Sequence, residues 1–196
     1  MKQQSKKLQN PKEKVSKYLA NIGFASRRGI ANLFSEKIIL LNGKKAKQAD
    51  LLADGDTLTI DGEDHIVDLN PETEVLIYHK PTGQVCSNVP TEKNDSVFSH
   101  IPPRKKGKWI MVGRLDVNTS GLLVFSNNGD FVNFLSHPSS RIDREYLCRV
   151  YGDITDKKIE NVMKGVNING EKSSFSDVVA VKKISKSKNH WFYVCL

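Results

Sequence analysis

The chain has 196 residues, 38% of them apolar, which suffices for one domain with a modest core or for two small domains. Its apolar runs are far shorter than the roughly 20 residues that cross a bilayer, and the first residues lack the apolar stretch of a signal peptide. We therefore expect a cytoplasmic protein with no membrane partner. The three cysteines, Cys86, Cys148 and Cys195, include no C-x-x-C pair, which argues against a disulfide framework or a zinc site.

The net charge of +8 is concentrated at the N-terminal end. Residues 1–49 hold twelve lysines and arginines against two glutamates, a local balance of +10, so the remaining residues together sum to −2. A surface this basic attracts polyanions and gains affinity by releasing counterions from phosphates. The charge pattern indicates a nucleic-acid partner for the N-terminal part.

Two short helices and a β-ribbon are predicted near the N-terminus. Apolar residues recur at helical spacing from Val15 to Ile22 and stop at Gly23. Ser26 is expected to cap a second helix with two arginines in its first turn, a position that the helix dipole disfavours for cations and that a ligand would explain. Residues 38–45 contain Asn42-Gly43, a strong hairpin signal, and a short strand is expected at 58–60. The predicted core residues are Leu19, Ile22, Leu33, Leu40 and Leu58.

This stretch resembles the S4 RNA-binding domain in its strings GFASRR (23–28), LNGKK (41–45) and GDTLTI (55–60). The resemblance covers residues 14–62 and leaves residues 1–13 as a basic tail. It implies an RNA-binding surface made by the helix entry and the hairpin. The residues assigned to that surface by resemblance are Lys14, Lys17, Ser26, Arg27, Arg28, Lys44 and Lys45.

An acidic, turn-rich linker is predicted at residues 63–73, followed by a second domain at 74–196. Strands are expected at 75–80, 109–112, 122–126, 145–151, 178–184 and 191–196, and helices near 129–136 and 155–164. Strands and helices alternate irregularly, which favours an α+β fold with a mixed or antiparallel sheet and flanking helices over a strict βαβ repeat.

The string GRLDVNTSG (113–121) lies between two apolar strands and invites three interpretations. Asp116, Asn118 and Ser120 have the spacing of a calcium loop, but one carboxylate is too little for a hard dication, so we expect no metal site. Asp116 can also serve an ordinary Asx turn by bonding the backbone near Asn118. The third interpretation is a functional carboxylate, kept ionised near Arg114, in a loop whose small residues let another chain approach.

Four longer strings favour the functional interpretation, because they resemble the RsuA/RluB-type pseudouridine synthases in the same order. They are HKPTGQVCS (79–87), GRLDVNTSGLLVFSNNGD (113–130), LSHPSSRIDREYLCRVYGD (135–153) and KGVNING (164–170). The match is closest to the type that acts on large-subunit ribosomal RNA. It implies isomerisation of a uridine to pseudouridine with no cofactor and no metal, and ribosomal RNA or a ribosome assembly intermediate as partner of a monomeric protein.

The resemblance also assigns roles to individual residues. Asp116 becomes the catalytic carboxylate, acting either as a nucleophile at C1′ or as a base at the 2′ position; both routes remain open. Arg114 would hold the flipped nucleotide or a phosphate, Thr119, Ser120 and Gly121 would allow its close approach, and Tyr146 would stack on the uracil. Without the family context, Tyr146 reads as an ordinary core aromatic.

The sequence ends within the strand-like string NHWFYVCL (189–196), where this family continues with a Glu-Gly-Arg-Asn-Arg-type segment that supplies an active-site arginine. We therefore expect a catalytic domain truncated at its C-terminus. Two functions follow: a pseudouridine synthase of uncertain activity, or an RNA-binding protein that keeps S4-type affinity but is catalytically impaired.

Overall fold

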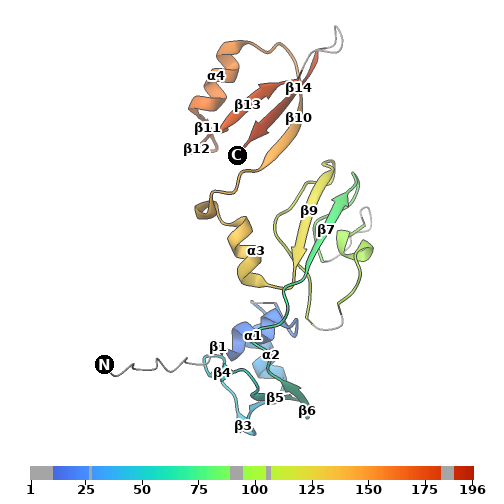
Figure 1. Cartoon of the computed structure of the whole chain (residues 1–196), viewed down its shortest axis with the longest axis vertical. Coiled ribbons are helices and arrows are strands. Elements are labelled where there is room, and N and C mark those ends of the chain that lie inside the picture. Colours follow the sequence, from blue (N-terminus) through green and yellow to red (C-terminus); the bar gives the residue numbers. More distant parts are fainter. Residues whose placement is uncertain (1–10, 27, 89–94, 105–106, 182–187) are drawn as a thin grey trace, which may run out of the picture. The chain divides into compact units, whose positions relative to one another are not determined.

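The computed structural model describes residues 11–26, 28–88, 95–104, 107–181 and 188–196. The described residues form an α+β fold with four α-helices and antiparallel sheets, as predicted (Figure 1). They group into two compact units, one reaching His137 and one from Pro138 to Leu196, which are described separately. This division falls at the middle of the predicted second domain rather than in the predicted linker. None of the helices in the described ranges is both long and apolar enough to span a membrane.

The first helix, α1 (Val15–Asn21), buries one apolar stripe formed by Val15, Tyr18 and Leu19. It ends where the sequence predicted, because Gly23 adopts φ +94° and Phe24 N donates to Leu19 O at 3.0 Å. These bonds satisfy the last carbonyls of the helix in the manner of a Schellman cap.

The second helix, α2 (Ile30–Glu36), begins later than predicted. Ser26 does not stand at the N-cap, which is Gly29; instead Ser26 Oγ accepts a hydrogen bond from Gly29 N at 3.0 Å and closes a turn before the helix. Arg28 lies in this turn rather than in the first helical turn, and Arg27 lies outside the described residues. The dipole argument for the arginine pair therefore does not apply.

A four-stranded sheet packs with these helices in the order β3-β2-β5-β6, where the strands are β2 (Ile39–Leu41), β3 (Lys44–Lys45), β5 (Thr57–Ile60) and β6 (Glu63–Ile66). The predicted hairpin at Asn42-Gly43 is confirmed, with φ of +50° and +77° at its two turn residues. Two predictions are wrong. Ile39 rather than Leu40 faces the core, which is a shift of one residue in the alternation. Glu63–Ile66 is an edge strand rather than linker, because its backbone pairs with β5.

Asp56 connects the turn between β2 and β3 with the turn that precedes β5. Its carboxylate accepts hydrogen bonds from Ala53 N at 2.7 Å and from Asn42 Nδ2 at 3.0 Å. These donors, the backbone N–H first, hold the pKa of Asp56 below its ordinary value because they favour the charged form.

The last residues of the predicted tail belong to the folded unit, because β1 (Lys12–Lys14) pairs with β4 (Leu51–Ala53). Residues 1–10 lie outside the described residues. The buried core of this part contains Leu19, Leu33 and Leu58 as predicted, while Ile22 is only partly buried.

A three-stranded sheet, in the order β7-β9-β8, forms the rest of the first unit. Its strands are β7 (Val75–Lys80), β8 (Ile110–Met111) and β9 (Gly121–Ser126), and it is followed by α3 (Gly129–Ser136). A short 3-10 helix, Val97–His100, packs on the sheet. The core around Phe125 and Val97 fixes β7 and β9. The string that carries Asp116 leads into β9 beside the last residue of β7, because Lys80 pairs with Gly121.

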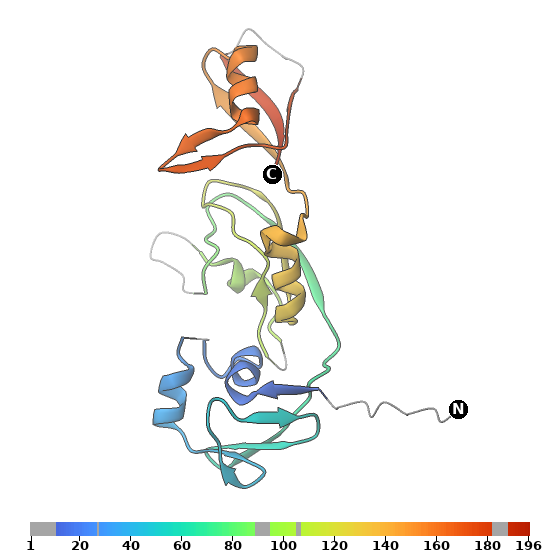
Figure 2. The same ribbon diagram turned by 90° about the vertical axis from the view of Figure 1, so that its left-hand side faces the viewer.

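The second unit contains a sheet in the order β10-β14-β13, formed by β10 (Glu145–Tyr151), β13 (Asp177–Ala180) and β14 (Asn189–Cys195). The helix α4 (Asp156–Lys164) contacts β13 and leads into a small hairpin, β11 (Val166–Ile168) and β12 (Glu171–Ser173) (Figure 2). The strand predicted at 178–184 ends at Ala180, and residues 182–187 lie outside the described residues.

Candidate functional site

Asp116 lies in the loop that joins β8 to β9, and its side chain is exposed. The turn that follows is closed by the backbone, since Thr119 N donates to Asp116 O at 3.0 Å. The carboxylate itself makes no hydrogen bond or ion pair with any other residue that the structure describes. The side-chain Asx turn considered above is therefore not what fixes Asp116, and its carboxylate is available to a ligand.

The loop is held in place by the side chain of Lys80, the last residue of β7. Lys80 has no exposed surface, and its ammonium donates hydrogen bonds to Thr119 O at 2.7 Å, Asp116 O at 3.0 Å and Pro81 O at 3.0 Å, with a longer one to Val117 O at 3.3 Å. A buried charge is costly unless its donors are satisfied. Here backbone carbonyls satisfy it, and three of them belong to residues 116–119.

Two further contacts brace the same loop. Gly83 N donates to Val117 O at 2.7 Å, and Leu115 N donates to Cys86 Sγ at 3.4 Å. Both donors and acceptors come from the loop after β7 and the loop before β9. The backbone on each side of Asp116 is thus fixed by the segment 80–86, while the residue itself is exposed.

Strand alternation explains why a lysine stands at this position. Leu76 and Tyr78 face the core of the first unit, and Lys80 follows on the same face of β7. Lys80 pairs across the sheet with Gly121, where a φ of +143° suits glycine. The sequence interpretation assigned no role to Lys80, although its inward-facing position in the string VLIYHK was a signal that could have identified it.

The other residues predicted around Asp116 lie in the same loop. Arg114 and Ser120 are exposed, whereas Thr119 and Gly121 are half-buried. Arg114 forms no ion pair with Asp116 among the described residues. In this structure the loop is held through its backbone by Lys80, and the role of Arg114 at the site stays a prediction.

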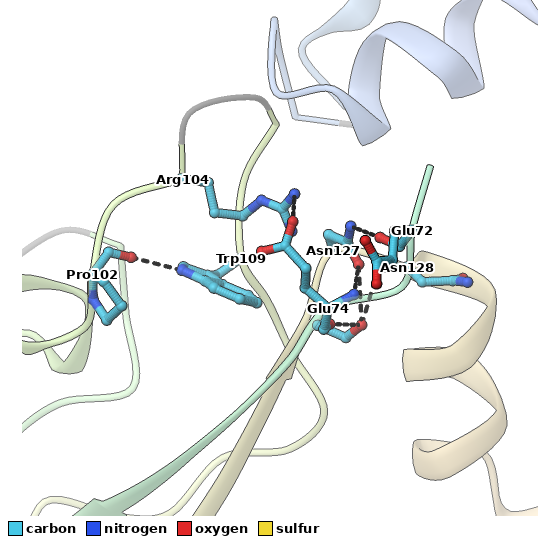
Figure 3. Close-up of polar contacts among 8 residues, drawn as sticks. Glu72, Glu74, Pro102, Arg104, Trp109, Asn127 and Asn128 are labelled. Atoms are coloured by element: carbon cyan, nitrogen blue, oxygen red, sulfur yellow. Dashed lines mark hydrogen bonds and ion pairs between the residues drawn. The ribbon is translucent and has the colours of Figure 1, made fainter. Parts of the chain in front are cut away.

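The end of β9 is joined to the start of β7 by the side chains of Ser126 and Asn127 (Figure 3). Asn127 Oδ1 accepts from Glu74 N at 2.9 Å, and its Nδ2 donates to Glu72 O at 2.8 Å. Ser126 Oγ donates to Glu74 O at 2.7 Å. These bonds help to fix the register of β7 and β9, whose other ends, at Lys80 and Gly121, lie next to the Asp116 loop.

Asn128 and Arg104 complete this network. Asn128 Oδ1 accepts from Asp130 N and Phe131 N, both at 3.0 Å, and so caps α3. Arg104 Nη2 donates to Glu74 Oε1 at 2.8 Å, and its guanidinium lies 5.0 Å from the centre of the Trp109 ring (Figure 3). The string SNNGD (126–130) is therefore structural: it clamps the strands and starts a helix.

Tyr146 belongs to the second unit, where it lies near the start of β10 and pairs with Val194. It is half-buried, on the same face of the sheet as the buried Phe192 and Val194. Tyr146 is therefore partly accessible and is not a fully buried core residue.

The residues predicted to bind RNA at the N-terminal end lie on several elements. Lys44 and Lys45 are exposed on β3, next to the hairpin turn, and Lys14 ends β1. Lys17 forms an ion pair with Glu13 at 2.8 Å and approaches Asp130 at 3.4 Å. The hydrogen bond that Lys17 donates to the Glu13 carboxylate raises the pKa of Lys17, so the charge of this lysine is partly offset by its own chain.

No group of three or more His, Cys, Asp or Glu side chains within the described ranges is arranged to hold a metal ion. In particular, Asp116 is not surrounded by further carboxylates.

Comparisons with known proteins place this geometry in a family. The model of the family described as RNA pseudouridylate synthase matches residues 74–195, which include both Asp116 and Tyr146. A crystal structure titled pseudouridylate synthase matches 92% of this chain and 76% of its own with a TM-score of 0.54 at 19% identity, a likeness that concerns the fold alone.

Curated relatives are similar over nearly the whole chain. Ribosomal large subunit pseudouridine synthase B of Vibrio cholerae is 39% identical over 94% of this chain and 58% of its own length. The protein of the same name from Pseudomonas aeruginosa is 37% identical over 92% of this chain and 47% of its own. The chain thus spans about half the length of these relatives. The protein of that name from Buchnera aphidicola of Acyrthosiphon pisum is 37% identical, with 92% of this chain and 73% of its own length covered. On the strength of these matches, the chain belongs to the RNA pseudouridylate synthase family.

Proposed function

We propose that the protein isomerises a uridine of large-subunit ribosomal RNA to pseudouridine, with Asp116 as the catalytic carboxylate. The observation that supports this most directly is the contrast at Asp116: its carboxylate is exposed and uncommitted among the described residues, while its backbone is bonded to the buried Lys80. A catalytic group needs this combination of accessibility and fixed position, because its geometry must be set before the substrate arrives.

The reaction requires the C1′–N1 bond to break and a C1′–C5 bond to form. The released uracil turns while it stays bound, its C5 proton leaves, and N1 ends with a proton, so atoms and electrons balance without a further reactant. An ionised carboxylate beside the sugar can attack C1′ or remove the 2′ proton, and Asp116 suits either step.

The target nucleotide has to leave its stack before a carboxylate can reach C1′, which costs a few kcal/mol. Contacts to the flipped nucleotide offset this cost. We assign them to Arg114, whose exposed guanidinium suits a phosphate, to Thr119, Ser120 and Gly121 in the Asp116 loop, and to stacking of the uracil on Tyr146.

Binding of structured RNA is assigned to an S4-type surface in the N-terminal part. Lys44 and Lys45 at the β2–β3 hairpin, Lys14, and Arg28 in the turn before α2 supply exposed cations for phosphates. Arg27 and Ser26 belong to the same surface by sequence. Lys17 contributes less, because its ammonium is already paired with Glu13. The partner is ribosomal RNA or a ribosome assembly intermediate, bound by a monomer.

Tritium release tests the proposal. Large-subunit ribosomal RNA that carries tritium at C5 of uridine loses that tritium to water when a C1′–C5 bond forms. We expect release by the wild-type chain and none by Asp116→Asn, which keeps the side-chain shape but removes the charge. Thr155→Ser, a change at the α4 N-cap far along the chain from Asp116, serves as the matched control and should behave as the wild type.

Circular dichroism and RNA-binding measurements distinguish a loss of catalysis from a loss of folding or of RNA binding. Asp116→Asn should fold and bind RNA as the wild type does. A wild-type chain that binds ribosomal RNA tightly but releases no tritium would refute the catalytic proposal and favour an RNA-binding protein without turnover.

A further inference from the structure

The sheet of the second unit has one open face that carries aromatic side chains. Strand alternation places Trp191 and Tyr193 of the central strand β14 on this face, together with Leu147 and Arg149 of β10. Trp191 is 41% exposed and Tyr193 43% exposed, which is unusual for large rings at the middle of a sheet. On the opposite face Phe192 and Val194 are buried.

The rows across the open face have a definite order. Leu147 pairs with Tyr193, and Arg149 pairs with Trp191, so that a guanidinium stands beside an exposed indole. At the other end of the sheet, Glu145 and Asp177 flank Cys195. Along the sheet the rows of this face are therefore Glu145 with Asp177, then Leu147 with Tyr193, then Arg149 with Trp191, and last Tyr151 with Asn189.

The side chains of this face are not committed within the unit. The side chains of Arg149, Trp191 and Tyr193 make no hydrogen bond, ion pair or ring contact with any residue in the part of the chain that the structure describes. Large exposed rings next to one another, with a charged group beside them, are typical of an interaction surface.

We infer that this face binds unpaired nucleotides of RNA by stacking bases on Trp191 and Tyr193, with Arg149 beside the backbone phosphate. Two aromatic rings at positions i and i+2 of a strand lie about 7 Å apart on one face, and sheet-type RNA-recognition modules stack two or three bases on such rings. Stacking tolerates any base, since each has a π-face. The acidic row of Glu145 and Asp177 repels phosphates, which favours their position beside Arg149.

The inference rests on the proposed function in one respect, because it takes RNA as the ligand class. It adds a surface that lies on a different unit from Asp116 and that requires no catalysis. It also commits to single-stranded RNA: a duplex hides its base faces and offers nothing for the two rings to stack on.

Fluorescence of Trp191 tests it. The chain has two tryptophans, so Trp109→Phe leaves Trp191 as the single reporter. Titration of the 196-residue Trp109→Phe chain with a 12-nucleotide oligouridylate should quench this fluorescence, whereas a 12-base-pair RNA duplex should not. In the same background, Tyr193→Ala should weaken binding about 5- to 150-fold, which corresponds to roughly 1–3 kcal/mol for one stacked base.

Three further variants make the test specific. Tyr193→Phe keeps the ring and should retain wild-type affinity, and Val179→Ala, an aliphatic change in the same row, should alter affinity less than twofold. Arg149→Gln should lower the slope of log affinity against log salt by about one. Circular dichroism confirms that each variant is folded.

The inference is overturned if the oligouridylate fails to quench Trp191, if the duplex quenches equally, or if Tyr193→Ala binds like Val179→Ala. It is also overturned if Tyr193→Ala abolishes self-association of the chain while RNA affinity is unchanged, because the face would then join two copies. Absence of pseudouridine formation with Tyr193-dependent quenching intact would instead refute the proposed function alone.

Discussion

Replacing Lys80 by methionine should loosen the Asp116 loop. Methionine fills much of the same volume but donates no hydrogen bond, so the four carbonyls around Lys80 Nζ lose their shared donor. Asp116 O keeps the bond from Thr119 N, and Val117 O keeps the bond from Gly83 N. Pro81 O and Thr119 O retain no other hydrogen-bond donor among the described residues.

The expected magnitude follows from these two carbonyls. An unsatisfied buried acceptor costs about 1–3 kcal/mol, so two cost about 2–6 kcal/mol. Removal of a buried ammonium offsets part of this loss. We therefore expect the free energy of unfolding to fall by about 2–4 kcal/mol. Turnover should fall further than stability explains, since a displacement of about 1 Å in a catalytic group can cost roughly 100-fold.

Urea denaturation and single-turnover tritium release measure the two effects. Below the unfolding transition, Lys80→Met should bind RNA with wild-type affinity and yet release tritium roughly 100-fold more slowly. Lys157→Met, which removes an exposed lysine of α4, is the matched control and should change neither quantity. A Lys80→Met protein with wild-type stability and turnover would show that Lys80 does not hold the loop.

Asp56→Asn should lower the free energy of unfolding at neutral pH and should make it depend less on pH in the acid range. The pKa of Asp56 is held below its ordinary value of 3.8, so its contribution to the free energy of unfolding is present above pH 3.8 and is lost as the pH falls through the lower pKa of the folded state. Urea denaturation from pH 6 to pH 2 should therefore show a steeper loss of stability for the wild type than for Asp56→Asn. Parallel curves for the two proteins would contradict this. Asn127→Ala should lower the unfolding temperature because the backbone groups Glu74 N and Glu72 O lose their shared partner, while Asn133→Ala on the exposed face of α3 should not. Equal effects would rule out the clamp. Arg27→Ala/Arg28→Ala should weaken RNA binding and lower its salt dependence without changing the turnover of bound RNA, and unchanged binding would exclude the S4-type surface.

Elements with a local signal were predicted well. The Asn42-Gly43 turn requires two residues that tolerate positive φ, and the hairpin is there. β7 at Val75–Lys80, α3 at Gly129–Ser136 and β10 at Glu145–Tyr151 match their predicted ranges, because each is bounded by turn residues or a capping side chain. The same signal at Asn169-Gly170, with φ of +53° and +90°, marks the β11–β12 hairpin, which the sequence interpretation did not use.

Elements that depend on distant partners were missed. Glu63–Ile66 is acidic and reads as a linker, and only its pairing with β5 makes it a strand. Ile39 and Leu40 are equally apolar, so the sequence does not decide which faces the core. Alternation along VLIYHK indicates that Lys80 faces inward, but it does not predict that its partners are carbonyls 36 to 39 residues further along the chain. Asp116, by contrast, was singled out from its string; its catalytic role stays a prediction, and the structure adds how its backbone is held.

Nucleoside analysis of the RNA product tests the central claim most directly. Large-subunit ribosomal RNA lacking pseudouridine is incubated with the wild-type chain or with Asp116→Asn, digested completely to nucleosides and separated by chromatography. We predict that pseudouridine appears with the wild-type chain and not with Asp116→Asn, although both bind the RNA equally. Pseudouridine formed by Asp116→Asn at the wild-type rate would contradict the assignment of Asp116 as the catalytic carboxylate.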